Sequence, residues 1–182
     1  MSIGNRIEIR VLMAADCGPG MLRDFERRQV VTHCWRRRDG EWVLEPIVYT
    51  EDWDEAKKEA VTRSLASCTQ DGGIVLGAYD LDRLVGFAAI EPGLFGGENR
   101  YVNLDMIHVS NGVRGLGIGR KLFEVCCEKA HCLGARKLYI SAHSSAESMA
   151  FYRRMGCVDA QQINEAMAEK EPCDCQLEKV IG

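Results

Sequence analysis

The segment richest in possible chemistry is the glycine-containing run at 113–121, VRGLGIGRK. It holds three alternating glycines and three neighbouring cations: Gly115, Gly117, Gly119, Arg114, Arg120 and Lys121. Glycines let the backbone bend sharply with N–H groups pointing into a concavity, and a following helix adds unpaired N–H groups and a positive dipole end. Because phosphate groups bind such positions, the run predicts a phosphate cradle rather than a plain tight turn.

This run differs from the known nucleotide-binding motifs, and the differences reduce the number of possible phosphate ligands. A P-loop needs GxxxxGK[ST], but Gly119 is followed by Arg120, and Leu122 follows Lys121. A dinucleotide fingerprint needs a glycine where Arg120 stands, and an acidic residue about 20 positions later, where KLYISA has none. The absence of HRD and DFG triplets from the sequence excludes a protein kinase.

Cysteine usage bears on metal and disulfide chemistry. The chain has nine cysteines, an odd number, and its first residues lack the apolar segment of a secretory signal. Both features argue against a disulfide framework. The one metal-like spacing is Cys173-Asp174-Cys175, and no second CxxC or HxxxH supplies the other ligands of a zinc site. We therefore expect no metal site.

The elements around the glycine run follow from hydrophobic periodicity. A strand at 101–109 leads into the turn, and a helix at 118–133 follows with its apolar residues on one face. After these we expect a strand at 136–142, a helix at 145–155 and closing strands at 157–162 and 175–181. This order predicts an α/β fold with at least one parallel crossover.

The first half of the chain shows a less regular pattern. It is expected to contain a strand at 6–12, helices at 20–35 and 53–68, and an antiparallel hairpin of strands at 73–80 and 84–91. Asp52 is placed as the N-cap of the second helix, because acidic residues follow it in the first turn.

Two motifs together resemble a known family. The run Arg114-Gly115-Leu116-Gly117-Ile118-Gly119 matches the R/Q-x-x-G-x-G/A signature of the GNAT superfamily of acyl-CoA-dependent N-acetyltransferases. The segment 145–157, SAESMAFYRRMGC, is similar to that family's N-x-x-A-x-x-F-Y-x-x-x-G-F segment, at the expected distance. The departures are Ser145 for Asn, Ser148 for Ala and Cys157 for Phe. A serine hydroxyl can still hydrogen-bond a pantetheine or phosphate oxygen.

The resemblance implies a fold and a cosubstrate. It implies one N-acetyltransferase domain over 1–182, with a mixed, mostly antiparallel central sheet flanked by helices, and a splayed parallel strand pair that holds acyl-CoA. It also implies that acetyl-CoA, the acyl donor, is bound by Ile107, His108, Val109, Arg114, Gly115, Leu116, Gly117, Ile118, Gly119, Arg120, Ser145, Ser148 and Tyr152. A strand N–H near Val109 would stabilise the oxyanion.

Two catalytic roles are expected. Tyr152 matches the family tyrosine that donates a proton to the leaving thiolate, although its pattern alone fits a core tyrosine equally well. Among carboxylates, Asp105 is the first candidate for the general base and Glu91 the second. Strand alternation without a bulge would place Asn103, Asp105, Ile107 and Val109 on one face, with His108 on the other.

The acceptor site is expected from the segments before the hairpin. Segment 39–59 has eight acidic residues and two lysines, with Trp42, Tyr49 and Trp53 interleaved, a combination that suits a cationic amine. A solvated helix start with core tryptophans is the alternative interpretation. The arginine-rich stretch 23–38 is expected to be an exposed helix face, with contacts to CoA phosphates as the alternative.

The composition of the chain argues against some classes of function. The 182 residues carry 23 Lys+Arg against 27 Asp+Glu, a net charge of −4, which argues against a nucleic-acid binder. No apolar run is long enough to span a membrane, so we expect a cytoplasmic protein without a membrane partner. The leading hypothesis is acetyl transfer to a primary amine of a small molecule by direct attack in a ternary complex. Protein N-terminal or lysine acetylation, a non-catalytic CoA-binding sensor and a homodimer stay open.

Overall fold

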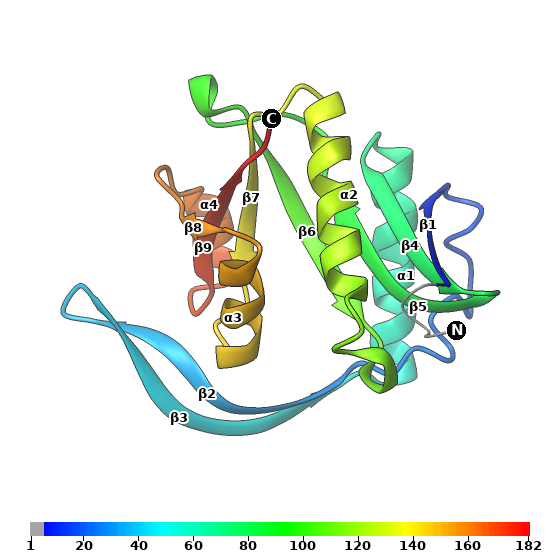
Figure 1. Ribbon diagram of the computed structural model, residues 1–182, viewed down its shortest axis with the longest axis horizontal. Helices are drawn as coiled ribbons and strands as arrows, with labels where there is room; N and C mark the ends of the chain where they lie inside the picture. The colour runs from blue at the N-terminus through cyan, green and yellow to red at the C-terminus, as the bar shows by residue number, and fades with distance from the viewer. Residues whose placement is uncertain (1–5) are drawn as a thin grey trace.

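The computed structural model describes residues 6–182 (Figure 1). Its helices and strands, in chain order, are β1 (Ile7–Leu12), β2 (Arg28–Arg38), β3 (Glu41–Asp52), α1 (Glu55–Gln70), β4 (Ile74–Asp80), β5 (Arg83–Ile90), β6 (Tyr101–Val109), α2 (Ile118–Cys132), β7 (Lys137–Ala142), α3 (Ala146–Arg154), β8 (Val158–Asp159), α4 (Glu165–Lys170) and β9 (Cys175–Val180). Two short 3₁₀ turns, Gly97–Asn99 and Asn111–Val113, flank β6.

Seven strands form one sheet in the order β1-β4-β5-β6-β7-β9-β8, and β2 and β3 form a separate two-stranded ribbon. Every pairing in the sheet is antiparallel except β6 with β7. In Figure 1, α2 lies in front of the sheet and α1 behind it, and the β2–β3 ribbon arches past the lower ends of β6 and α3. The expected mixed, mostly antiparallel sheet with one parallel pair is confirmed.

Two apolar clusters hold the helices onto the sheet. The larger one packs α2 residues such as Leu122 and Cys126 against Leu104 of β6 and Leu138 of β7. The second packs Val61 and Leu65 of α1 against Val75 and Phe87 of β4 and β5. Burial of these side chains on both faces fixes the position of β6 between the clusters.

The parallel strands β6 and β7 form a fork. Their ladder contains only three residue pairs, from Tyr101–Lys137 to Asn103–Tyr139, although both strands continue beyond it. Figure 1 shows the two strands meeting near the C-terminus of the chain and separating toward the ribbon. Leu104–Val109 therefore has no ladder partner on its β7 side within the described part of the chain. The splayed pair that the family resemblance implied is present.

The expected helix at 20–35 is wrong. Residues 20–24 form turns, and β2 begins at Arg28 and pairs with β3 up to Arg38–Glu41. Asp39 and Gly40 connect the two strands with φ of 49° and 88°, the left-handed conformations of a two-residue hairpin turn. The β-branched residues of VVT, at 30–32, and the Asp-Gly dipeptide were the local signals for this hairpin. The apolar spacing alone was compatible with either structure.

The other long elements were predicted with small boundary differences. The strands at 101–109 and 136–142 and the helices at 118–133 and 145–155 correspond to β6, β7, α2 and α3. The N-cap of α1 is Asp54 rather than Asp52, because the Asp54 carboxylate accepts a hydrogen bond from the Lys57 N–H at 2.7 Å. Helix α4 was not expected from the sequence.

Candidate active site

The open edge of β6 presents backbone groups to the fork. Ser110 N–H donates to Val85 O of β5 at 2.9 Å, and alternation along the strand then turns the N–H groups of Val109 and Ile107 away from β5. Since β7 pairs only as far as Asn103, these two N–H groups face the space between the strands. An extended amide-containing arm can bond to such an edge as an additional strand would.

The glycine turn lies at the wide end of the fork. Gly115 and Gly117 have φ of 80° and 81°, and Gly117 is the N-cap of α2 without a side-chain hydrogen bond. A Cβ placed on either glycine would meet nothing within 4 Å, so the space beside the turn is open. Left-handed glycines, a helix N-terminus without a side-chain cap and open space together fit a phosphate group.

Neighbouring residues fix the position of this turn. Arg114 Nε donates to Val109 O at 3.1 Å, which ties the turn to the end of β6. Ile118 is buried in the larger cluster, whereas Leu116 and Arg120 are exposed. A Cβ on Gly119 would lie 3.2 Å from the Phe151 ring, so the absence of a side chain there lets α2 approach α3 closely.

Tyr152 lies on α3 among aromatic rings. Its ring centroid is 5.2 Å from that of Phe151 and 6.3 Å from that of Phe123. Burial, with the nearby thiols of Cys157 and Cys126, raises the pKa of Tyr152, so the phenol stays protonated at neutral pH. Its hydroxyl has no hydrogen-bond partner among residues 6–182. A protonated phenol with an unused donor can supply a proton.

The two serines of the second motif bond mainly to the protein. Ser145 is fully buried and is the N-cap of α3, and its hydroxyl accepts from Ser148 N–H at 3.2 Å and from Gln29 Nε2 at 3.2 Å. Its own proton goes to Ser148 Oγ at 2.9 Å. Ser145 therefore has a capping role that the sequence analysis did not foresee, and Ser148, which is half-buried, is the more accessible of the two.

Asn103, Asp105, Ile107 and Val109 do not lie on one face of β6. The register shifts from Ile90–Leu104 to Ala89–Met106, so Asp105 is the extra residue of a β-bulge. Beyond the bulge, Ile107 and Val109 pack on the larger cluster with Leu104, whereas Met106 joins the second cluster. The expected alternation over 103–109 is wrong, because the bulge reverses the facing of every later side chain.

At the bulge, the Asp105 carboxylate lies near the carboxylate of Glu91. Its side chain is exposed, yet loss of hydration and the nearby Glu91 carboxylate raise its pKa, with Lys170 of α4 acting in the opposite direction. Asn103 Nδ2 donates to Glu91 Oε2 at 2.8 Å, and Glu91 N–H donates to Asn103 O at 2.9 Å. The structure thus brings together the two carboxylates considered for the base.

A buried arginine was missed by the sequence analysis. Arg27 is 7% exposed and donates from Nε to His108 Nδ1 at 3.2 Å and from Nη2 to Glu51 at 2.8 Å. Because an arginine only donates, the neutral His108 ring carries its proton on Nε2. Burial and the Arg27 charge lower the pKa of His108 to about 3. His108 is therefore neutral at physiological pH and lacks a free lone pair for general base catalysis.

A second polar pair lies at the end of β7. His143 Nδ1 accepts from Ser145 N–H at 3.3 Å, and its Nε2 lies 2.6 Å from the Tyr49 hydroxyl of β3. Tyr49 and Glu51 lie two residues apart on β3, so they share one face of the ribbon. Tyr49 contacts His143 at the end of β7, and Glu51 contacts Arg27, which bonds to His108 of β6. The Asp39-Gly40 turn alone would place Tyr49 and Glu51 opposite Val30 and Arg28, and the bulge between Val31 and His33 shifts their partners to Val31 and Gln29.

The aromatic residues of segment 39–59 do not converge on one acceptor site. Trp53 packs against His108, with ring centroids 4.9 Å apart, whereas Tyr49 contacts His143. Trp42 lies at α3, where its Nε1 donates to Asp159 at 3.1 Å and it lines a cavity of about 280 Å³ with Trp35. The ribbon geometry separates side chains that are close in sequence.

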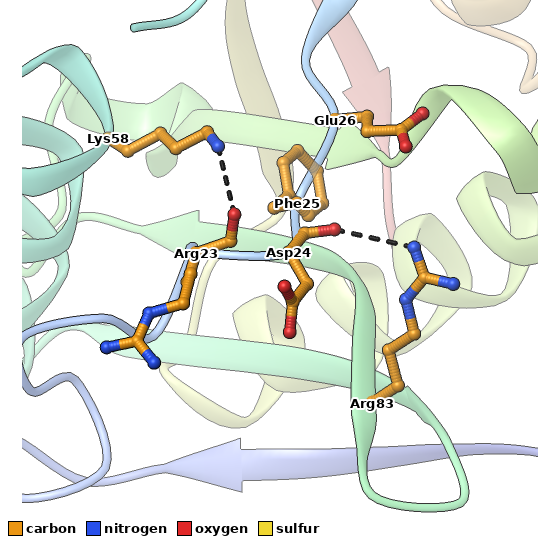
Figure 2. Close-up of a pocket in the computed structure, with 6 residues that line it drawn as sticks. All are labelled: Arg23, Asp24, Phe25, Glu26, Lys58 and Arg83. Carbon is orange, nitrogen blue, oxygen red and sulfur yellow. Dashed lines mark hydrogen bonds between the residues drawn. The ribbon is translucent and has the colours of Figure 1, made fainter. Parts of the chain in front are cut away.

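A larger pocket of about 510 Å³ lies beside the start of α1 (Figure 2). Its lining residues are Arg23, Asp24, Phe25, Glu26, Lys58 and Arg83. Lys58 Nζ and Arg83 Nη2 donate to the backbone oxygens of Arg23 and Asp24, at 3.0 and 3.4 Å. The pocket contains none of the predicted catalytic or cofactor-binding residues, although Arg23 and Lys58 belong to the segments 23–38 and 39–59.

Across residues 6–182, no group of three or more His, Cys, Asp or Glu side chains is arranged to hold a metal ion. In the same range, no helix is long and apolar enough to cross a membrane.

Comparisons with known proteins agree with this geometry. The family model described as Acetyltransferase (GNAT) family matches residues 30–157. A crystal structure of nourseothricin acetyltransferase superposes with a TM-score of 0.68 at 19% identity, covering 97% of this chain and 99% of that one. A protein described as a streptothricin acetyltransferase from Bacillus anthracis, solved with acetyl coenzyme A, gives 0.68 at 17% identity, covering 98% and 96%.

A third structure, the PaiA N-acetyltransferase of Thermoplasma acidophilum with coenzyme A, gives a TM-score of 0.57 at 15% identity and covers 99% of both chains. No match to a curated protein sequence was found. At these identities the structural likeness shows a shared fold, and the family model supplies the assignment.

Proposed function

The chain belongs to the acetyltransferase (GNAT) family, and from this premise we propose that it transfers the acetyl group of acetyl-CoA to a primary amine of a small molecule. The observation that carries the proposal is the fork of β6 and β7, which leaves Leu104–Val109 without a ladder partner on its β7 side, beside the left-handed glycines of the turn. A strand edge for the pantetheine amides and a helix N-terminus for the pyrophosphate suit the two chemically distinct parts of CoA.

The cosubstrate would be held mainly by backbone groups. The N–H groups of Ile107 and Val109 would bond to the pantetheine arm, and those from Gly115 to Arg120 would surround the pyrophosphate. The positive end of α2 and the Arg120 side chain favour this negative charge. Bound acetyl-CoA supplies the activated acetyl group, and the remaining chemistry is proton transfer and charge stabilisation by the chain.

Two side chains and one backbone N–H group would act on the reacting atoms. The Asp105 carboxylate would take a proton from the acceptor ammonium, so that the amine can form the new C–N bond. An N–H group of β6 would stabilise the negative charge on the acetyl oxygen. As the C–S bond breaks, the Tyr152 phenol would donate its proton to the departing thiolate, and the second proton that the nitrogen loses on becoming an amide would restore the phenol. Acceptor and donor are bound together, so no acetylated form of the protein is required.

The extent of the domain is also a proposal. We infer one catalytic domain over 1–182, supported by a family match over 30–157 and by structural neighbours that align with nearly the whole chain.

Thiol release from acetyl-CoA in the presence of a panel of amines and peptides tests the function. We expect turnover with small primary amines. Turnover with peptides alone would favour a protein acetyltransferase. If acetyl-CoA raises the melting temperature but no acceptor is acetylated, a non-catalytic CoA sensor would replace the proposed enzyme.

A further inference from the structure

Four of the eight acidic residues of segment 39–59 already have close partners. Glu45 pairs with Arg38 at 2.6 Å, Glu51 with Arg27 at 2.8 Å and Glu55 with Lys58 at 3.0 Å. Asp54 caps α1. These partners reduce the negative charge available there to attract a cationic ligand.

Glu91 and Asp105 differ from those acids. Neither forms an ion pair within residues 6–182. The two carboxylates lie near each other where the fork opens, and loss of hydration together with Glu91 raises the pKa of Asp105. Burial, with Asp105, Glu91 and Asp71 nearby, raises the pKa of Cys68 to about 11. Lys170 opposes the effect of Glu91 by lowering the pKa of Asp105. The region therefore has an excess of negative charge.

A buried acceptor atom points to the missing partner. Asn103 is 7% exposed, and its Nδ2 bonds to Glu91, which directs the amide into this cluster. Its Oδ1 is buried and has no hydrogen-bond donor within the described residues 6–182. Leaving such an oxygen without a donor is unfavourable, so a ligand that supplies an N–H would be favoured.

The C-terminal end of α1 also favours a cationic ligand at this position. Cys68, in the last turn of α1, donates from Sγ to Ile90 O at 3.3 Å, which places that turn beside the residue preceding Glu91. The last turn of α1 has no basic residue. The C-terminal end of a helix carries partial negative charge and favours a cation.

We propose that Glu91 and Asn103 bind a second ammonium group of the acceptor, so that the preferred acceptor is a diamine or polyamine. This inference rests on the proposed acetyl transfer. The reacting amine would lie at Asp105 and the distal ammonium at Glu91, where its three N–H donors can satisfy Glu91 and Asn103 Oδ1. Glu91 is thus a specificity residue, distinct from the proposed base.

Steady-state acetylation of 1,5-diaminopentane, 1,4-diaminobutane and pentylamine tests this assignment. For the wild type we expect a kcat/KM at least tenfold higher for the better diamine than for pentylamine. Glu91→Gln keeps an acceptor for Asn103 Nδ2 but removes the charge. It should raise the KM for the diamine about tenfold, equivalent to about 1.4 kcal/mol, and leave the KM for pentylamine within twofold.

Two further variants make the result specific. Glu91→Asp retains the charge and should keep the preference for the diamine. Glu98→Gln, on an exposed acid outside this cluster, should change neither KM. Equal kcat/KM for diamine and monoamine in the wild type, or an unchanged diamine KM in a folded Glu91→Gln, would overturn the inference while leaving acetyl transfer intact. Absence of turnover with every amine would instead reject the proposed function.

Discussion

Tyr152 combines a raised pKa with a hydroxyl that has no hydrogen-bond partner among residues 6–182. These properties suit an acid that must stay protonated until a thiolate forms. By contrast, the Tyr139 hydroxyl donates to Gln176 at 2.7 Å and accepts from Asn164 N–H at 2.9 Å, so it has a structural role. At the residue scale, the hydrogen bonds of the hydroxyl group therefore distinguish Tyr152, the candidate acid, from Tyr139, which has a structural role.

Tyr152→Phe removes the proton donor and keeps the ring contacts with Phe151 and Phe123. We expect kcat to fall about 100-fold, the lower end of general acid contributions, with the Kd for acetyl-CoA within twofold of wild type. Thiol-release kinetics and isothermal titration calorimetry measure the two quantities. Tyr79→Phe, on β4, is the matched control. An unchanged kcat in Tyr152→Phe would remove the assignment.

Asp105 accepts a proton only when it is ionised. Because its pKa is raised, it becomes ionised at a higher pH than an ordinary aspartate does. We expect kcat/KM to fall as the pH decreases through this raised pKa, at a higher pH than for an ordinary aspartate. Asp105→Asn should abolish the acidic limb of the pH profile and lower kcat about 100-fold or more. An acidic limb that persists in the variant would point to another base.

His108 affects stability rather than proton transfer. Its pKa of about 3 in the folded state lies below the ordinary 6.5, so the unfolded chain binds more protons between these values. Stability is therefore lost as the pH falls below 6.5, by about 2 kcal/mol from pH 7 to pH 5. His108→Gln should reduce this loss in urea unfolding, and the exposed-site variant His33→Gln should not. Equal losses in both variants would contradict the prediction.

At the element scale, the junction of β6 with α2 depends on backbone conformation. The strand edge and the glycine turn act through N–H groups, which are the same in every residue type except proline. What the sequence must supply is the left-handed conformation at Gly115 and Gly117 and the close approach at Gly119. The bulge at Asp105 similarly redirects side chains without changing their identity.

Gly117→Ala tests the turn by adding a methyl group where φ is 81° and the surrounding space is open. We expect a loss of about 1 to 2 kcal/mol in unfolding free energy from backbone strain alone, and weaker acetyl-CoA binding. Gly117→Asn should be milder, because asparagine tolerates this conformation. Gly112→Ala, in the same loop without positive φ, should be neutral in urea unfolding and calorimetry. Equal effects at both glycines would refute the argument.

At the scale of the whole molecule, a buried cluster holds the closed end of the fork. Glu178 of β9 is 2% exposed and accepts from Tyr101 of β6, from Lys137 of β7 at 2.9 Å and from Gln161 N–H at 3.0 Å. Burial opposes ionisation of Glu178, but these donors together lower its pKa. Three strands are thus joined where β6 and β7 still pair, so the separation is confined to the other end.

Glu178→Gln weakens these contacts by removing the charge that Lys137 and Tyr101 contact. We expect a loss of about 2 to 3 kcal/mol in the unfolding free energy, because hydrogen bonds to a buried charged group are worth more than neutral ones. Urea denaturation measures it, and Glu165→Gln on an exposed turn of α4 is the control. A loss below about 0.5 kcal/mol would show that the cluster does not stabilise the fork.

The sequence by itself determined the parts whose signal is local. The spacing of Gly115, Gly117 and Gly119 after an apolar strand specified the turn, and Tyr152 followed from its place in the second motif. Periodicity sufficed for β6, α2, β7 and α3, because each of these elements buries a regular pattern of side chains. The same reasoning failed at 20–35, where pairing with a distant strand decided between two structures that the local pattern allowed.

Only the tertiary structure decided which side chains meet. Strand pairing set the bulge at Asp105, and this reversed the facing of Ile107 and Val109. Long-range contacts also brought Arg27 to His108 and Asn103 to Glu91, although nothing in the intervening sequence marks these pairs. The physical reason is that backbone conformation depends mainly on nearby residues, whereas charge pairing and the burial of an unpaired oxygen depend on segments that only the complete fold brings together.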